Sequence, residues 1–136
     1  MVLDTNALFL PVRRGFPLEA EIHRVVPGAR LIVPSSARDE LDRLATSGTR
    51  GAIAAREIAA RYAVEPTDRP GDDGVLDVAG RLGAIVVTAD RALQRRLVAA
   101  GIPILVPRDR HRLEPRAGRG PSPGRTPPVR RRRGNS

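Results

Sequence analysis

The sequence predicts an α/β protein in which a central parallel β-sheet carries helices on both faces. Short aliphatic runs alternate along the chain with segments whose apolar residues recur at helical spacing, which is the pattern of consecutive βα units. Crossovers between such strands are right-handed in nearly all proteins, so the strands are expected to lie parallel. A length of 136 residues fits one domain with one hydrophobic core.

Five aliphatic runs are predicted to be strands. Each is short and is bounded by turn residues or by a segment with helical periodicity. In chain order the predicted strands are residues 1–3, 30–33, a weak one near Val64, 84–88 and 102–106.

Five helices are predicted between these strands, because apolar residues return to one face every three or four positions. Their apolar faces comprise Leu18, Ile22, Val25 and Val26; Ala37, Leu41, Leu44 and Ala45; Ala55, Ile58, Ala59 and Tyr62; Val75, Leu76, Ala79 and Leu82; and Leu93, Leu97 and Ala100. Residues 46–56, which precede the third apolar face, are predicted to be a plain connection between helices. A substrate-contacting loop is the alternative.

The composition predicts a folded domain over residues 1–112 and a disordered basic tail over residues 113–136. The stretch "GRGPSPGRTPPVRRRRGNS" contains a single aliphatic residue, Val129, so it cannot bury enough apolar area to offset the entropy of ordering. Most of the net charge of +9 lies in this part of the chain. Arg130, Arg131, Arg132 and Arg133 are candidate contacts to nucleic-acid phosphates, and a tail without a binding role is the alternative.

Several classes of function are excluded by composition. The chain has no Cys, so it has no disulfide, thiolate metal site or cysteine nucleophile. Three aromatic residues are too few for a platform on which bases stack. We expect a cytoplasmic protein that does not contact membranes, because no apolar run reaches membrane-spanning length and the N-terminus lacks a signal-peptide pattern.

Two acidic residues follow predicted strands directly or closely. Asp4 comes after the first strand in "VLDTN", and Asp90 follows the fourth in "VVTAD". Ligands of open parallel sheets bind beyond the carboxyl ends of the strands, where the strand order reverses. We therefore expect both carboxylates in one crevice. A turn role for Asp4 and a helix-capping role for Asp90 are the alternatives.

Two predicted helices add acids to the same crevice. Glu40 lies close to the apolar face centred on Leu41, whereas the acids beside it point away. Asp72 shares the direction of the apolar face of the fourth helix, and Asp73 is the second choice because the first turn need not be regular helix. A solvated charge for Glu40 and a helix cap for Asp72 are the alternatives.

A cluster of carboxylates without a neutralising cation predicts a metal site. Two carboxylates about 4 Å apart repel by roughly 4 kcal/mol at an effective dielectric constant of about 20. Oxygen ligands without His or Cys suit Mg²⁺ or Mn²⁺. Such an ion with open positions fits the hydrolysis of a phosphodiester bond. The predicted metal ligands are Asp4, Asp72 or Asp73, and Asp90.

Four blocks of the sequence together resemble the PIN-domain nuclease family: "VLDTNALFLP", "IVPSSARDELDRLA", "DDGVLDVAGRLGAIVVTADRALQRRL" and "GIPILV". The resemblance implies a three-layer α/β/α sandwich and a metal-dependent ribonuclease that acts on RNA. It places the family's catalytic acids on Asp4, Glu40, Asp72 and Asp90, with Asn6 and Thr88 in supporting positions. The Asp72–Asp73 pair and the segment after "GIPILV" resemble the branch linked to ribosomal RNA processing more than the toxin branch.

Two alternative functions stay open at the level of sequence. One is a toxin ribonuclease, whose partner would be an antitoxin protein. The other is an RNA-binding protein on the same fold without catalysis. The resemblance also implies a homodimer, because dimers are common in that family.

Overall fold

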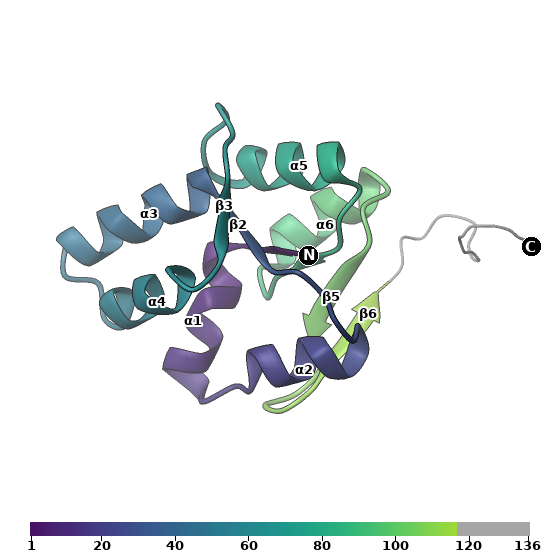
Figure 1. Ribbon diagram of the computed structural model, residues 1–136, viewed down its shortest axis with the longest axis horizontal. Helices are drawn as coiled ribbons and strands as arrows, with labels where there is room; N and C mark the ends of the chain where they lie inside the picture. Colours follow the sequence, from purple (N-terminus) through teal and green to yellow (C-terminus); the bar gives the residue numbers. More distant parts are fainter. Residues whose placement is uncertain (117–136) are drawn as a thin grey trace, which may run out of the picture.

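The computed structural model describes residues 1–116, which form a six-stranded sheet with helices on both faces (Figure 1). The strand order is β3-β2-β1-β4-β5-β6. Neighbouring strands from β3 to β5 pair in parallel, and β6 pairs antiparallel with β5. The strands are β1 Val2–Leu3, β2 Ile32–Pro34, β3 Ala63–Glu65, β4 Val86–Val87, β5 Ile104–Pro107 and β6 Leu113–Arg116. The five predicted strands are therefore confirmed, each with shifted ends.

The helices form the two outer layers of a three-layer α/β/α sandwich, as predicted. Figure 1 shows α5 and α6 on one side of the strands and α1 and α2 on the other. Side chains of α3 and α4 share a core with those of α1 and α2. The helices are α1 Thr5–Arg14, α2 Leu18–Val25, α3 Ser35–Thr46, α4 Ala52–Ala59, α5 Gly71–Leu82 and α6 Arg91–Ala99.

Each central strand contributes side chains alternately to the two cores. In β1, Val2 packs with α5 and α6 while Leu3 packs with the helices of the opposite face. Val86 and Val87 of β4 divide in the same way, and all four side chains are fully buried. This alternation follows from the pleat of a strand, in which successive side chains point to opposite faces of the sheet.

Helix α1 was not expected from the sequence. It begins directly after Asp4, whose Oδ1 accepts a hydrogen bond from the backbone N–H of Ala7 at 2.7 Å. Pro11 lies inside it, and a proline removes one helical hydrogen bond, which argues against a helix at the level of sequence. The helix nevertheless buries four consecutive residues in the core, Ala7, Leu8, Phe9 and Leu10.

The predicted start of the tail at residue 113 is wrong, because residues 113–116 form β6. The Leu113 side chain is buried, its backbone N–H donates to Glu21 Oε1 at 2.8 Å, and Arg24 donates to its carbonyl oxygen at 3.0 Å. These contacts from α2 order a segment that composition alone assigned to the tail. The rest of that tail, including Arg130 to Arg133, lies outside the described residues.

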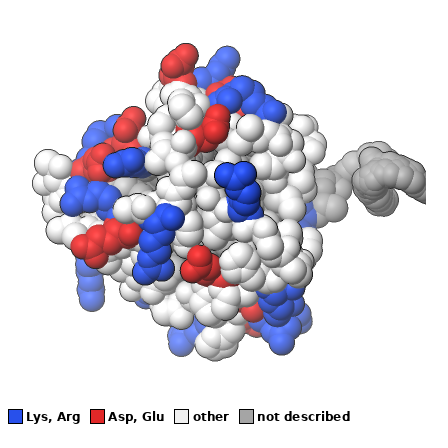
Figure 2. All heavy atoms as spheres, viewed as in Figure 1, with Lys and Arg blue, Asp and Glu red and all other residues white. Residues whose placement is uncertain are grey.

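The surface of the folded part has mixed charge. Figure 2 shows arginines and acidic residues interspersed over one face of the molecule. Within residues 1–116, no helix is long and apolar enough to cross a membrane.

Candidate active site

The strand order reverses between β1 and β4, and this is where Asp4 and Asp90 lie. The two strands are hydrogen-bonded neighbours in the centre of the sheet. Asp4 caps α1, and Asp90 caps α6 by accepting a hydrogen bond from the N–H of Leu93 at 3.0 Å. Both acids therefore lie at the switch point, where the sequence predicts a crevice. Asp4 and Asp90 each cap a helix and also lie at the switch point.

Thr88 joins these two acidic positions. Its hydroxyl donates to Asp4 Oδ2 at 2.7 Å and accepts a hydrogen bond from the backbone N–H of Asp90 at 3.0 Å. Thr88 is fully buried, and only 4% of Asp4 is exposed. Both oxygens of Asp4 thus receive a hydrogen bond inside the protein, which orients this carboxylate firmly.

Glu40 approaches from α3, which begins at the end of β2. The hydroxyl of Thr5 donates to Glu40 Oε1 at 2.9 Å. This contact ties the first turn of α1 to α3. Glu40 is half-buried at the edge of the core, on the side of the helix that the sequence predicts.

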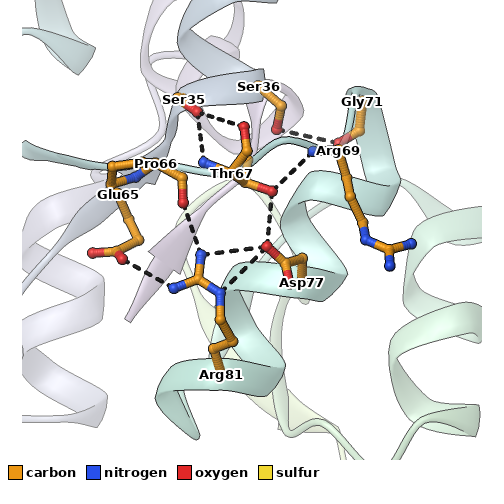
Figure 3. Close-up of polar contacts among 9 residues, drawn as sticks. All are labelled: Ser35, Ser36, Glu65, Pro66, Thr67, Arg69, Gly71, Asp77 and Arg81. Atoms are coloured by element: carbon orange, nitrogen blue, oxygen red, sulfur yellow. Dashed lines mark hydrogen bonds and ion pairs between the residues drawn. The ribbon is translucent and has the colours of Figure 1, made fainter.

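Asp72 lies in the first turn of α5, and the loop before it is held by a network of hydrogen bonds (Figure 3). Thr67 is at the centre of this network. Its backbone N–H donates to Ser35 Oγ at 2.9 Å, and its hydroxyl donates to Asp77 Oδ2 at 2.8 Å. The N-cap position of α5 is Pro70, so the capping alternative for Asp72 is wrong.

Arg81 of α5 contacts the beginning of the same loop, directly after β3 (Figure 3). Its guanidinium donates to the carbonyl oxygen of Pro66 at 2.7 Å and forms ion pairs with Glu65 and Asp77. These partners lie at the end of β3 and on α5. The segment from β3 to α5 is therefore fixed at both ends, and so is the helix turn that carries Asp72.

Close packing of α3 against α5 sets the distance between the helices that carry Glu40 and Asp72. It occurs at Gly74, where a Cβ atom would lie 2.6 Å from the carbonyl oxygen of Arg69 and 2.7 Å from Ser36 Cβ. The Ser36 hydroxyl also donates to the carbonyl oxygen of Gly71 at 3.3 Å. A side chain at position 74 would push these two helices apart.

Asp73 does not join the crevice. Its carboxylate forms an ion pair with Arg96 of α6 at 2.6 Å, and half of its side chain is exposed. It borders a separate surface depression together with Asp77 and Arg81. The structure thus places Asp72 with the other predicted acids and leaves Asp73 outside.

The four predicted acids line one cavity of about 240 Å³. Asn6, the predicted supporting residue, is exposed and lines the same cavity. The acids are contributed by the carboxyl edge of the sheet and by α3 and α5. The complete lining is Asp4, Thr5, Asn6, Phe9, Arg13, Ala37, Glu40, Leu44, Thr49, Gly71, Asp72, Val75 and Asp90.

Burial and mutual repulsion perturb the carboxylates in this cavity. Burial raises the pKa of Asp4 to about 7; hydrogen bonds from Thr88 and Ala7 oppose this shift, and the charges of Asp72 and Asp90 add to it. Burial also raises the pKa of Asp72, with a contribution from Asp90 that outweighs the opposing charge of Arg96. None of the four acids forms an ion pair with another residue of the described chain.

The donor set suits a hard divalent cation, but the carboxylates do not converge on one point. Within residues 1–116, no three acidic or histidine side chains are close enough together to hold a metal ion. Oxygen donors without sulfur or imidazole are the ligands that Mg²⁺ and Mn²⁺ prefer. The residue types therefore fit such an ion, although the side chains as placed are not gathered around one point.

A family model described as a PIN like domain matches residues 1–110. The chain belongs to the PIN-like domain family. It is 29% identical over 111 residues to Ribonuclease VapC9 of Archaeoglobus fulgidus, covering 76% of this chain and 78% of that relative. The solved structure of the PIN domain endonuclease Utp24 matches with a TM-score of 0.71 at 22% identity, over 84% of this chain and 88% of that one. The latter likeness concerns the fold alone.

Eight residues of this PIN-like domain line the cavity without having been predicted as site residues, and four of them lie on or beside α1 or α4. Thr5, Phe9 and Arg13 belong to α1, so their places could not be anticipated while that helix was unrecognised. Thr49 belongs to the connection between α3 and α4, for which the sequence favoured a purely connecting role. The one available signal was the polar "DTN" triplet that follows the first strand.

Proposed function

We propose that this PIN-like domain is a metal-dependent ribonuclease that hydrolyses RNA phosphodiester bonds. The observation that carries the proposal is the lining of a single cavity by Asp4, Glu40, Asp72 and Asp90. The names of the relatives support it, since one is a ribonuclease and the other a PIN domain endonuclease. An RNA-binding protein without catalysis would not need four unneutralised acids in a site for a polyanion.

Asp4, Asp72 and Asp90 are the residues that would hold Mg²⁺ or Mn²⁺. When bound, such an ion stabilises negative charge on the scissile phosphate and lowers the pKa of a water molecule. Thr88 and the N–H of Ala7 keep the buried Asp4 carboxylate in a fixed orientation. Replacement of mutual repulsion by attraction to a cation would draw the three carboxylates together.

Glu40 is the residue that we assign to proton transfer. Thr5 donates to one carboxylate oxygen of Glu40, which leaves the group able to accept a proton on the other. In the proposed reaction, a water oxygen bonds to phosphorus, its proton passes to Glu40, and the bond between phosphorus and the leaving oxygen breaks. The leaving oxygen takes its proton from solvent.

The proposal is tested by incubating the purified full chain with a labelled single-stranded RNA and Mn²⁺. Asp4→Asn and Asp90→Asn are each expected to reduce the cleavage rate by at least about 100-fold, because loss of a ligand costs at least as much as loss of its supporting partner. Asp39→Asn is the matched control, since Asp39 is exposed on α3 and does not line the cavity. Equal cleavage by all four proteins would point to another site or a contaminating nuclease.

The biological branch of the family stays a prediction. We favour a role in RNA processing over a toxin role, on the sequence features described above. Both roles use the same reaction, so they differ in partner rather than in chemistry. Growth arrest on expression, relieved by the product of an adjacent gene, would overturn the processing role and support an antitoxin partner.

A further inference from the structure

Arg13 is a basic residue that lines the same cavity as the four acids. It lies in the last turn of α1, and Asp4 lies at the beginning of that helix. Opposite charges that share a cavity usually pair. Within residues 1–116, however, Arg13 forms no ion pair with an acid.

Two contacts hold the Arg13 guanidinium at its place. It stacks over the ring of Phe9, with its central carbon 4.0 Å from the ring centre. One of its nitrogens donates to the carbonyl oxygen of Arg50 at 3.3 Å. Phe9 is 7% exposed, so the ring is a fixed support. A stacked arginine retains its N–H donors at the edge of the guanidinium plane.

The loop that accepts this hydrogen bond is itself fixed against α1. Gly51 adopts φ +83°, and a Cβ atom there would lie 2.9 Å from Val12 Cγ1. Thr49, two residues earlier, lines the same cavity as Arg13. We call these three lining residues, Phe9, Arg13 and Thr49, the Arg13 wall.

We propose that Arg13 binds a phosphate of the RNA strand next to the one that is cleaved. This inference rests on the proposed function, because it assigns a contact within the same site. An RNA strand that enters a cavity lined by four acids is repelled at each of its phosphates. A divalent cation held by the acids would compensate the charge of the scissile phosphate, and Arg13 compensates that of its neighbour. A guanidinium offers five N–H donors, of which one is used by Arg50.

The Arg13 wall also explains why this cation does not neutralise the acids. Stacking on Phe9 and the hydrogen bond to the Arg50 carbonyl oxygen hold Arg13 in a position where it pairs with none of the four acids. The carboxylates stay available for a cation, and the guanidinium stays available for an anion. Arg96, by contrast, is engaged by Asp73 outside the cavity.

The test compares Arg13→Gln with Arg14→Gln in the full chain. Arg14 is the next residue of the same helix turn and is exposed, but it does not line the cavity. Arg13→Lys retains the charge and serves as a second variant, and circular dichroism melts show whether each variant folds. Two readouts are used: steady-state cleavage of a labelled oligouridine with Mn²⁺, and binding of the same oligomer in EDTA at several KCl concentrations.

Arg13→Gln is expected to raise KM about tenfold, a typical loss for one charge-assisted contact, with kcat within about twofold of the wild type. The slope of log affinity against log salt should become shallower by about one unit, as for one lost phosphate contact. Arg13→Lys should recover the salt slope but only part of KM, since lysine cannot stack in the same way. Arg14→Gln should change KM and the slope less than Arg13→Gln.

The proposal is overturned when Arg13→Gln and Arg14→Gln give the same KM and salt slope while the wild type cleaves RNA. If the wild type binds RNA without cleaving it, and the salt slope still depends on Arg13, the phosphate contact is supported and the proposed hydrolytic function is contradicted. Absence of binding by the wild type would remove both.

Discussion

The hydroxyl of Thr88 donates a hydrogen bond of 2.7 Å to Asp4 Oδ2, between two residues that are 84 positions apart in the chain. The same hydroxyl accepts the backbone N–H of Asp90 at 3.0 Å. The buried Thr88 hydroxyl, directly after β4, therefore contacts both the Asp4 side chain, which follows β1, and the backbone of Asp90. The site depends on this connection, because it orients Asp4 and the turn that carries Asp90.

Thr88→Val is expected to weaken both activity and stability. The change leaves the Asp90 N–H without its acceptor and removes a hydrogen bond that lowers the pKa of Asp4. We expect a loss of about 1–3 kcal/mol in the free energy of unfolding, the cost of leaving buried polar groups unpaired. The acidic limb of the pH–rate profile should move to higher pH. Thr88→Ser, which keeps the hydroxyl, should behave nearly as the wild type. If valine and serine give the same pH–rate profile, the hydrogen bond has no such role.

The buried Asp4 carboxylate predicts a pH-dependent stability of the metal-free protein. The pKa of Asp4 is about 7 in the folded chain and 3.8 in the unfolded one. At a pH between these two pKa values, the folded state binds more protons than the unfolded state. The free energy of unfolding therefore falls as the pH rises from about 4 to about 7. The fall attributable to Asp4 is on the order of 4 kcal/mol, because one pKa unit corresponds to about 1.4 kcal/mol.

Urea unfolding in EDTA measures this effect by comparing the wild type with Asp4→Asn across that pH range. The variant should be less stable relative to the wild type at pH 4 than at pH 8, where it should become the more stable protein. Added Mn²⁺ should stabilise the wild type at pH 8 and have little effect on the variant. Parallel pH profiles of the two proteins would show that the buried charge is not a source of strain.

Two glycines of α5 provide a matched pair for the packing of α3 on α5. Gly74→Ala places a Cβ atom 2.7 Å from Ser36 Cβ of α3, and overpacking of this kind costs typically about 1–3 kcal/mol. A Cβ atom at Gly80 meets nothing within 4 Å, so Gly80→Ala should stabilise the helix by roughly 0.5–1 kcal/mol. Thermal melts measure both effects. A Gly74→Ala variant as stable as Gly80→Ala would contradict the close approach of the helices.

Asp72 and Asp73 are adjacent acids with different expected effects. Asp72→Asn should abolish most of the Mn²⁺-dependent cleavage, because Asp72 lines the cavity with the other acids. Asp73→Asn should retain it, because Asp73 pairs with Arg96 on the outside and an exposed pair contributes about 0–1 kcal/mol to stability. Cleavage assays on the two variants decide between them, and the reverse result would exchange the roles of the two residues.

The sequence was sufficient to predict five of the six strands and the place of the acids, because both depend on local pattern. Aliphatic runs identified five strands, and the rule for parallel sheets brought Asp4 and Asp90 together. Helical geometry selected Glu40 and favoured Asp72 over Asp73. The confirmed strands and helices are those in which the regularly spaced apolar residues are also mostly buried or half-buried.

The parts that could not be predicted depend on contacts between distant residues. Helix α1 contains Pro11 and is stabilised by burial against the sheet rather than by its own propensity. Strand β6 pairs with β5, and Glu21 and Arg24 of α2 bind its first residue, Leu113, through the backbone. The Arg13 wall requires both α1 and the loop at Arg50, so no local pattern could indicate it.

A crystal of the protein soaked in Mn²⁺ and measured for anomalous scattering tests the central claim most directly. The account predicts a manganese peak in the cavity, within coordination distance of carboxylate oxygens of Asp4, Asp72 and Asp90, with these side chains closer together than in the metal-free protein. A cavity that stays empty at saturating Mn²⁺, or a peak at Asp73 instead, would contradict it.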